Sequence, residues 1–167
     1  YEGATKWEAA LAGNPYLKTI VPISGTTSTK TLLFKNGSAE ARSQVMHGAY
    51  FINIVDFDES DADHVCPDVA DGFTRGERTY LEPRVDADLN YWNERDYRQR
   101  SIDNYQGSVY FVQGLQDWNV DSHMIFPLYQ QMKDAGFDVK GMFGQWGHHY
   151  PDQWTSHDGI DNNNGGT

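Results

Sequence analysis

An aspartate and a pair of histidines follow two apolar segments of this 167-residue chain, where they could do acid–base chemistry. Asp117 comes shortly after the β-branched and aromatic run at 109–112, and His148 and His149 follow the run at 138–144. In open α/β sheets, ligands bind at the carboxyl ends of the strands. A buried aspartate that accepts a hydrogen bond from a histidine ring fixes the ring's tautomer and stabilises its protonated form. The pattern therefore predicts an acid–base pair of the kind found in hydrolases.

Alternating helical and apolar segments predict the sheet that positions these side chains. Two segments have helical patterns, 5–12 and 122–135. Three short runs are strand-like, namely 17–25, 108–113 and 138–144. Helix, strand, long insertion, strand, helix and strand in this order are typical of a parallel α/β sheet with crossover helices.

We expect four consecutive parts along the chain. Residues 1–30 and 101–155 form the first and second parts of the α/β core, and residues 31–100 form an inserted, mainly helical cap. Residues 156–167 form a linker, because the segment DGIDNNNGGT is rich in asparagine and glycine.

Composition excludes several classes of partner. The formal net charge is −11, whereas nucleic acids and anionic membrane surfaces attract clustered Lys and Arg. No apolar run approaches the ~20 residues that span a bilayer. Cys66 is the single cysteine, which excludes an internal disulfide and predicts a structural thiol. Few lysines and many Asn, Gly and Tyr residues lean towards an extracellular protein, although composition does not decide the compartment.

A nucleophile is missing from the hydrolase pattern. In α/β-hydrolases the triad follows the order Ser, Asp, His, and the serine stands in a G-x-S-x-G turn between a strand and a helix. The opening Tyr1-Glu2-Gly3, followed by a helical segment, looks like the second half of such a turn. The serine would then directly precede Tyr1, and the Tyr1 amide would be an oxyanion donor. We therefore expect this chain alone to be inactive.

Five segments together resemble the catalytic domain of the Xaa-Pro dipeptidyl-peptidase and cocaine-esterase family of serine hydrolases. They occur in the family's order over nearly the whole chain: YEG at 1–3, TIVPISGTTS at 19–28, YWNERDYR at 91–98, GLQDWNV at 114–120 and GQWGHHYPD at 144–152. GLQDWNV and YWNERDYR resemble the peptidase branch more than the esterase branch.

The resemblance implies roles for individual residues. Asp117 would be the triad acid, and His148 the general base, because the family's histidine directly follows the W-G pair. Asn119 would lie near the amino-terminal side of a peptide substrate. Trp118 and Trp92 would line the substrate pocket.

The resemblance also implies a fold and an activity. The family has an α/β-hydrolase fold with a helical cap and a carboxyl-terminal β-sandwich. Its members cleave a dipeptide after a penultimate proline, or hydrolyse esters and related acyl bonds, without a metal or an organic cofactor. The expected partners are a peptide or small acyl substrate and the remainder of the same protein, namely the first hydrolase strands and the β-sandwich. Arg95 is expected to be a structural partner of an acidic side chain.

Other interpretations of these residues stay open. Asp117 could be only a turn former, and the chain could be a non-catalytic binding protein with hydrolase architecture. His148 and His149, with Asp152, His157 and Asp158, contain enough nitrogen and oxygen ligands for zinc, but the H-E-x-x-H spacing is absent. The acidic stretches 56–64 and 158–165 lack the full calcium-loop pattern, which favours solvated loops over a structural calcium site.

Overall fold

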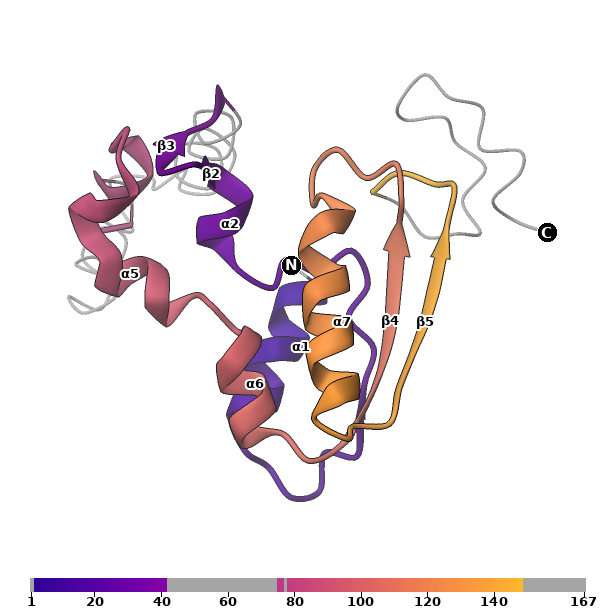
Figure 1. Ribbon diagram of the computed structural model, residues 1–167. Helices are drawn as coiled ribbons and strands as arrows, with labels where there is room; N and C mark the ends of the chain where they lie inside the picture. The colour runs from indigo at the N-terminus through magenta and orange to yellow at the C-terminus, as the bar shows by residue number, and fades with distance from the viewer. Residues whose placement is uncertain (1, 42–74, 77, 149–167) are drawn as a thin grey trace, which may run out of the picture. The chain divides into compact units, whose positions relative to one another are not determined.

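The computed structural model of the protein describes residues 2–41, 75–76 and 78–148 (Figure 1). The chain divides into two compact units. Unit 1 comprises residues 1–32 and 96–167, and unit 2 comprises residues 33–95. Helix α2 (Thr29–Leu33) crosses the division. The expected boundaries of core, cap and linker stay a prediction.

Unit 1 contains a parallel sheet of three strands in the order β1-β4-β5. These are β1 (Thr19–Ile20), β4 (Ser108–Gly114) and β5 (Val139–Gly144). The β4–β5 pairing runs in register from Val109 opposite Val139 to Gly114 opposite Gly144. The parallel sheet predicted from the alternating pattern is thus confirmed.

Strand β1 is shorter than the predicted segment 17–25. Regular pairing ends at Ile20, and Ile23 adds only an isolated bridge to Val112. Pro22 lies between them and has no N–H for the ladder. Ser24 then has a φ of 46°, which turns the chain out of the extended conformation.

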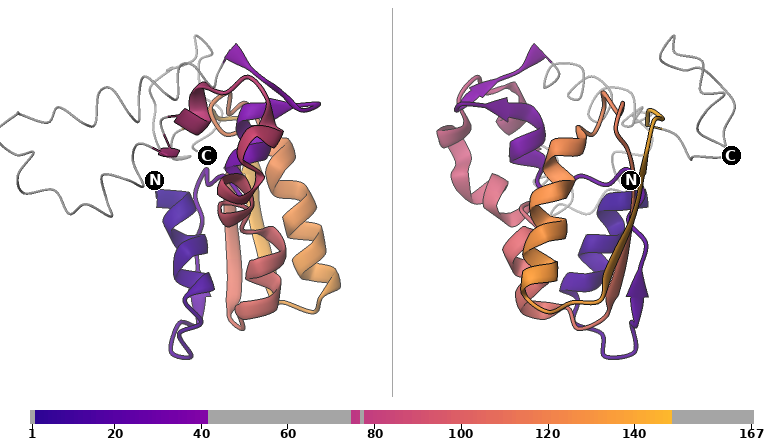
Figure 2. Two further views of the ribbon diagram at one scale, coloured as in Figure 1. Left: turned by 90° about the vertical axis from the view of Figure 1, so that its left-hand side faces the viewer. Right: turned by 45° about the vertical axis from the view of Figure 1, so that its right-hand side comes forward.

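Three helices lie on one side of this sheet (Figures 1 and 2). They are α1 (Glu2–Leu11), α6 (Arg98–Asn104) and α7 (Ile125–Asp134), the last preceded by the 3₁₀ turn η4 (Ser122–Met124). The helices predicted at 5–12 and 122–135 are confirmed. Pro127 stands in the first turn of α7, where the helix needs no backbone N–H from it.

The core of unit 1 fills the space between these helices and the sheet. Alternate residues of β4, Val109 and Phe111, are buried against the helices, whereas Tyr110 on the other face is 38% exposed. The Phe111 ring lies 5.5 Å from the indole of Trp7 on α1 and 5.6 Å from the ring of Tyr129 on α7. Apolar burial on the helix side of β4 therefore determines which face of this strand packs against the helices.

Unit 2 begins with a hairpin of β2 (Phe34–Lys35) and β3 (Ser38–Ala39). Asn36 and Gly37 connect the two strands with φ values of 53° and 84°. Positive φ at both central residues is the requirement of a type I′ turn, for which Asn-Gly is the preferred pair.

Further elements of unit 2 are the 3₁₀ helix η3 (Val85–Asp88) and α5 (Leu89–Glu94). Trp92 on α5 is fully buried, and its ring contacts those of Phe34, Tyr80 and Tyr91 at centroid distances of 5.1, 5.3 and 5.1 Å. This aromatic cluster holds the hairpin against α5.

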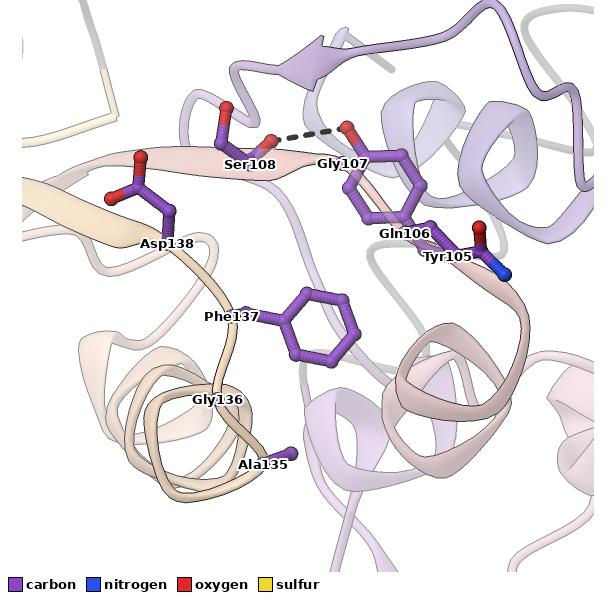
Figure 3. A pocket seen from close by; sticks show the side chains of 8 residues that line it. All are labelled: Tyr105, Gln106, Gly107, Ser108, Ala135, Gly136, Phe137 and Asp138. Atoms are coloured by element: carbon purple, nitrogen blue, oxygen red, sulfur yellow. Dashed lines mark hydrogen bonds between the residues drawn. The ribbon is translucent and has the colours of Figure 1, made fainter.

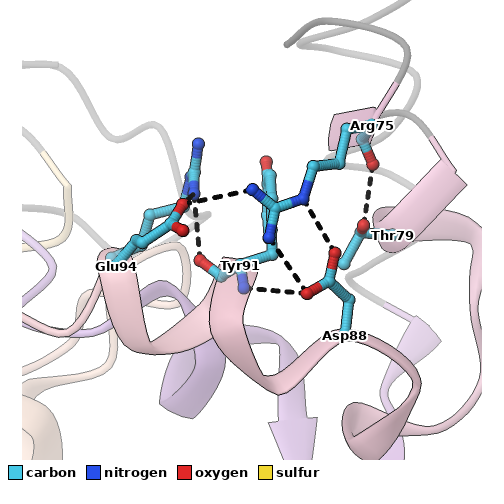
Figure 4. Close-up of polar contacts among 6 residues, drawn as sticks. Arg75, Thr79, Asp88, Tyr91 and Glu94 are labelled. Carbon is cyan, nitrogen blue, oxygen red and sulfur yellow. Dashed lines mark hydrogen bonds and ion pairs between the residues drawn. The ribbon is translucent and has the colours of Figure 1, made fainter. Parts of the chain in front are cut away.

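An ionic network covers Tyr91 in unit 2 (Figure 4). The Arg75 guanidinium donates to both carboxylate oxygens of Asp88, at 2.9 and 3.0 Å. Arg95 lies over the Tyr91 ring, 3.6 Å from its centroid, and donates to Glu94 Oε2 at 3.2 Å. Arg95 thus has the acidic partner that the sequence predicted for it.

Several predictions fall on residues outside the described ranges. They concern Cys66, the acidic stretches 56–64 and 158–165, and the linker 156–167. Within the described ranges, no helix is long and apolar enough to cross a membrane. The same residues contain no group of three or more His, Cys, Asp or Glu side chains that could hold a metal ion.

Candidate active site

The carboxyl ends of β4 and β5 bring Asp117 and His148 together. His148 Nδ1 lies 2.9 Å from Asp117 Oδ2, a hydrogen-bonding distance. The Asp117 side chain is completely buried, whereas the His148 side chain is 35% exposed. A histidine held through Nδ1 by a buried carboxylate leaves Nε2 as the ring atom available to a reacting group.

Asp117 also organises its own loop. Its Oδ1 accepts hydrogen bonds from the backbone N–H groups of Asn119, at 2.9 Å, and Val120, at 2.8 Å. This is the local turn-forming behaviour that aspartate shows after a strand. One carboxylate oxygen therefore stabilises the turn while the other faces His148, so the two interpretations of Asp117 are compatible.

Gln113, the penultimate residue of β4, was not among the predicted site residues. Its side chain is buried, and Nε2 donates to Asp117 Oδ2 at 3.1 Å. The signal was an amide side chain in an otherwise apolar strand, VYFVQG. Pattern alone could not say which polar group it meets, because that depends on where the chain turns after Gly114.

The loop after β5 is attached to the end of β4 by two backbone hydrogen bonds. Leu115 N–H donates to the Gly144 carbonyl at 2.8 Å, and Gln116 N–H donates to the Trp146 carbonyl at 3.1 Å. A Cβ added at Gly114 would lie 2.2 Å from the Trp146 carbonyl oxygen. Glycine at 114 therefore permits the close approach of the chain segment that leads to His148.

The other predicted site residues have different surroundings. Trp118, next to Asp117, is 58% exposed, and Asn119 is half-buried. Trp92 lies in unit 2, fully buried in the aromatic cluster described above. Tyr1 and His149 lie outside the described residues, as do the further ligands of the zinc alternative.

The electrostatics of Asp117 depend on neutral donors and one histidine. Among the described residues, His148 is the only basic side chain that forms an ion pair with this carboxylate within 4 Å. A buried carboxylate without a partner is strongly unfavourable, and hydrogen bonds to its charged form offset that cost. The arrangement can therefore stabilise a positive charge that forms on His148 when its ring accepts a proton.

The opposite end of the sheet offers a cavity of about 320 Å³ but no comparable chemistry (Figure 3). Its walls include the stacked rings of Tyr105 and Phe137. The Tyr105 hydroxyl is already used, because it donates to the Ser108 carbonyl at 3.0 Å. Asp138 is the only charged residue of the lining, so this cavity has no acid–base pair.

Comparison with protein families and curated proteins gives two matches. A family model described as X-Pro dipeptidyl-peptidase (S15 family) matches residues 1–150. A curated Xaa-Pro dipeptidyl-peptidase from Ligilactobacillus salivarius is 24% identical over 173 aligned residues. That alignment covers 92% of this chain and 22% of the relative, so the chain spans about a fifth of the relative's length.

Comparison with solved structures identifies the fold. The acylaminoacyl peptidase from Pyrococcus horikoshii matches 87% of this chain and 18% of its own length, with a TM-score of 0.50 and 16% sequence identity. An esterase structure matches with a TM-score of 0.46 at 9% identity, covering 87% of this chain and 53% of its own. The fold of this chain is that of the α/β-hydrolases, as the residue pattern predicted.

Proposed function

This chain belongs to the X-Pro dipeptidyl-peptidase family (S15), and on that premise we propose that it carries the acid and the base of a serine peptidase. The proposed substrates are peptides with proline as the second residue, from which the enzyme releases an Xaa-Pro dipeptide. The curated relative bears the name of this activity.

In the proposed mechanism a serine directly before Tyr1 attacks the carbonyl carbon of the proline. His148 accepts the proton of the serine hydroxyl and later gives it to the leaving amine, which produces an acyl-enzyme. Water then attacks the acyl carbon with His148 as base, the ester bond to the serine breaks, the Xaa-Pro dipeptide leaves, and His148 returns the proton to the serine oxygen. Asp117 orients the ring and stabilises its protonated form, and the Tyr1 amide stabilises the oxyanion.

The observation that carries this proposal is the distance of 2.9 Å between His148 Nδ1 and Asp117 Oδ2. The two side chains are 31 positions apart in the sequence and follow the ends of neighbouring parallel strands. Pairing across such a separation needs the whole sheet, whereas turn formation by Asp117 needs only its own loop. The exposure of the two side chains also favours catalysis. The Asp117 carboxylate is buried and the His148 ring is partly exposed, and only the ring has to reach the substrate.

The proposal assigns the substrate side of the site to three residues. Trp118 would lie beside the substrate, and its exposure next to Asp117 supports that assignment. Asn119 would face the amino-terminal side of the peptide, and the assignment of Trp92 to the pocket stays a prediction from its motif position. These three assignments rest on the motif positions within GLQDWNV and YWNERDYR.

The test measures hydrolysis of Gly-Pro-p-nitroanilide by protein that includes the sequence preceding Tyr1. His148→Ala should lower kcat by on the order of 10⁶-fold, because the serine loses its base. The matched control is His123→Ala. His123 is also paired with an aspartate, Asp121, but at 3.9 Å and with a side chain that is 54% exposed. Its removal should change kcat by less than about 3-fold, in the range of ordinary surface substitutions.

Labelling with a serine-directed phosphonate distinguishes the remaining outcomes. Attachment of the label to the serine before Tyr1, lost in His148→Ala, supports the proposed triad. Equal turnover in His148→Ala and wild type would overturn it. Preference for p-nitrophenyl acetate over the prolyl substrate would instead identify an esterase of the same family.

A further inference from the structure

We propose that Gln113 is a positioning residue for the acid–base pair, with its side-chain amide holding the Asp117 carboxylate in the orientation that faces His148. The inference rests on the proposed function of Asp117 and His148. It adds a residue whose role follows from the hydrogen bonds at the end of β4.

The orientation of the Gln113 amide is determined by its surroundings. Besides Asp117 Oδ2, its Nε2 lies 3.2 Å from the Gly114 carbonyl oxygen and 3.0 Å from the Val120 carbonyl oxygen. All three neighbours are acceptors, so a flipped amide would bring its own oxygen against three oxygens. The NH₂ group must therefore face Asp117.

The same contacts complete the set of donors around the carboxylate. Oδ1 is held by the N–H groups of Asn119 and Val120, and Oδ2 is shared between Gln113 and His148. Without the amide, Oδ2 would keep only the histidine, and the carboxylate could rotate about its Cβ–Cγ bond towards other donors. Such rotation would misalign the His148 ring, which needs accurate placement for proton transfer.

Gln113 also connects strand β4 to the loop 115–120 that follows it. The amide spans from Asp117 to the Val120 carbonyl, and therefore crosses the turn that places the carboxylate. Its Oε1 is buried and has no hydrogen-bond partner among the described residues. Burial of an unpaired amide oxygen disfavours the folded state, so an amide at this position is explained by its donor side.

The experiment compares Gln113→Met with a matched surface variant, Gln130→Met. Gln130 Nε2 donates to the Asp134 carboxylate at 2.7 Å on the exposed side of α7, so the same kind of bond is deleted far from the site. Gln113→Met should lower kcat by about 10- to 100-fold, with KM within about 3-fold of wild type, as expected for misalignment of a catalytic group. Gln130→Met should leave both constants within about 2-fold.

A double-mutant cycle separates positioning from simple loss of structure. If Gln113 acts through Asp117, then Gln113→Met in the Asp117→Asn background should cost less than about 3-fold in kcat. If Gln113→Met lowers kcat by the same factor in the wild-type and Asp117→Asn proteins, Gln113 contributes to the fold alone, and the inference is overturned. If Asp117→Asn itself keeps wild-type turnover, the proposed function fails instead, so the two failures are distinguishable.

An NMR measurement on the same protein reports on the acid–base pair without turnover. The NMR signal of the His148 Nδ1 proton should shift or broaden in Gln113→Met and stay unchanged in Gln130→Met. If Gln113→Met does not fold, Gln113→Asn replaces it, because this variant keeps a buried amide but shortens the side chain by one methylene group. An unchanged His148 signal together with kcat within about 3-fold of wild type, in whichever variant folds, would overturn the inference.

Discussion

Asp117 in unit 1 and Asp88 in unit 2 both accept hydrogen bonds from nearby backbone N–H groups, but their side-chain partners differ. Asp117 accepts from the N–H groups of Asn119 and Val120, and Asp88 accepts from the Tyr91 N–H at the start of α5. The remaining partners differ. Asp117 meets a histidine and an amide, whereas Asp88 meets the forked guanidinium of Arg75.

The difference shows which carboxylate is suited to chemistry. The arginine beside Asp88 stays protonated throughout the accessible pH range, so that pair has a constant charge and serves the fold. The His148 imidazole can accept a proton and pass it on within a catalytic step, so the Asp117 pair can change its charge during a reaction. The environments differ too, because the Asp117 side chain is fully buried and that of Asp88 is 29% exposed.

The largest expected effect comes from replacing each aspartate by asparagine. Asp117→Asn should lower kcat by on the order of 10⁴-fold, because the ring of His148 would lose its orienting anion. Asp88→Asn should leave kcat within about 3-fold of wild type and lower thermal stability. Steady-state kinetics on the prolyl substrate and a melting curve for each variant make the comparison. Similar kcat values for the two variants would contradict the assignment of a catalytic role to Asp117 and a structural role to Asp88.

A smaller effect is expected from two glycine substitutions, one in each unit. Gly114→Ala places a methyl group against the Trp146 and Gly147 carbonyl oxygens, at 2.2 and 2.3 Å before any relaxation. The segment that carries His148 must then move, and kcat should fall by about 100-fold.

Gly37→Ala is the counterpart in unit 2. Gly37 has a φ of 84° and open space around it, so the alanine costs only left-handed strain, about 1–2 kcal/mol of stability. Turnover should be kept in this variant. Loss of turnover in Gly37→Ala equal to that in Gly114→Ala would mean that both positions act through general destabilisation.

The smallest effect concerns acid stability. The hydrogen bonds from Arg75 lower the pKa of Asp88, and the bond from Tyr91 N–H acts in the same direction. A carboxyl whose pKa is lower in the folded state contributes stability above its unfolded pKa of about 3.9, and that contribution is lost as pH falls through the folded value. Arg75→Met should therefore lower the melting temperature at pH 7 and reduce its further decline below about pH 4.

The matching control for acid stability is Arg84→Met. Arg84 pairs with Asp86 and also lowers the pKa of that carboxyl, but the two side chains are 74% and 51% exposed, so solvent screens most of the interaction. Its melting temperature should follow that of wild type at each pH. If the melting temperatures of Arg75→Met and wild type fall in parallel below pH 4, protonation of Asp88 does not control the loss of stability in acid.

Much of unit 1 could be predicted from local patterns. The strand run before Asp117 is apolar because β4 is largely buried, and the helix at 122–135 has one apolar face, so both patterns are visible in the sequence. The run before His148 is half-buried to exposed in β5, and its pattern is correspondingly weaker. The truncation of β1 at Ile20 was not predicted, because it depends on how Pro22 and Ser24 meet the edge of β4. The surroundings of Trp92 could not be predicted either, because its position in the motif does not indicate which aromatic rings pack against it.

Residue types and their spacing were enough to predict the order of elements, the strand ends that carry ionisable side chains, and the family that their motifs resemble. These properties depend on residue type and short-range spacing, which a linear pattern records. Two features become visible only in the folded protein: Asp117 Oδ2 contacts both His148 and Gln113, and Gly114 allows the two segments at the strand ends to approach closely. Those contacts join residues through the register of neighbouring strands and the path of a turn, which depend on the packing of the whole unit rather than on any one segment.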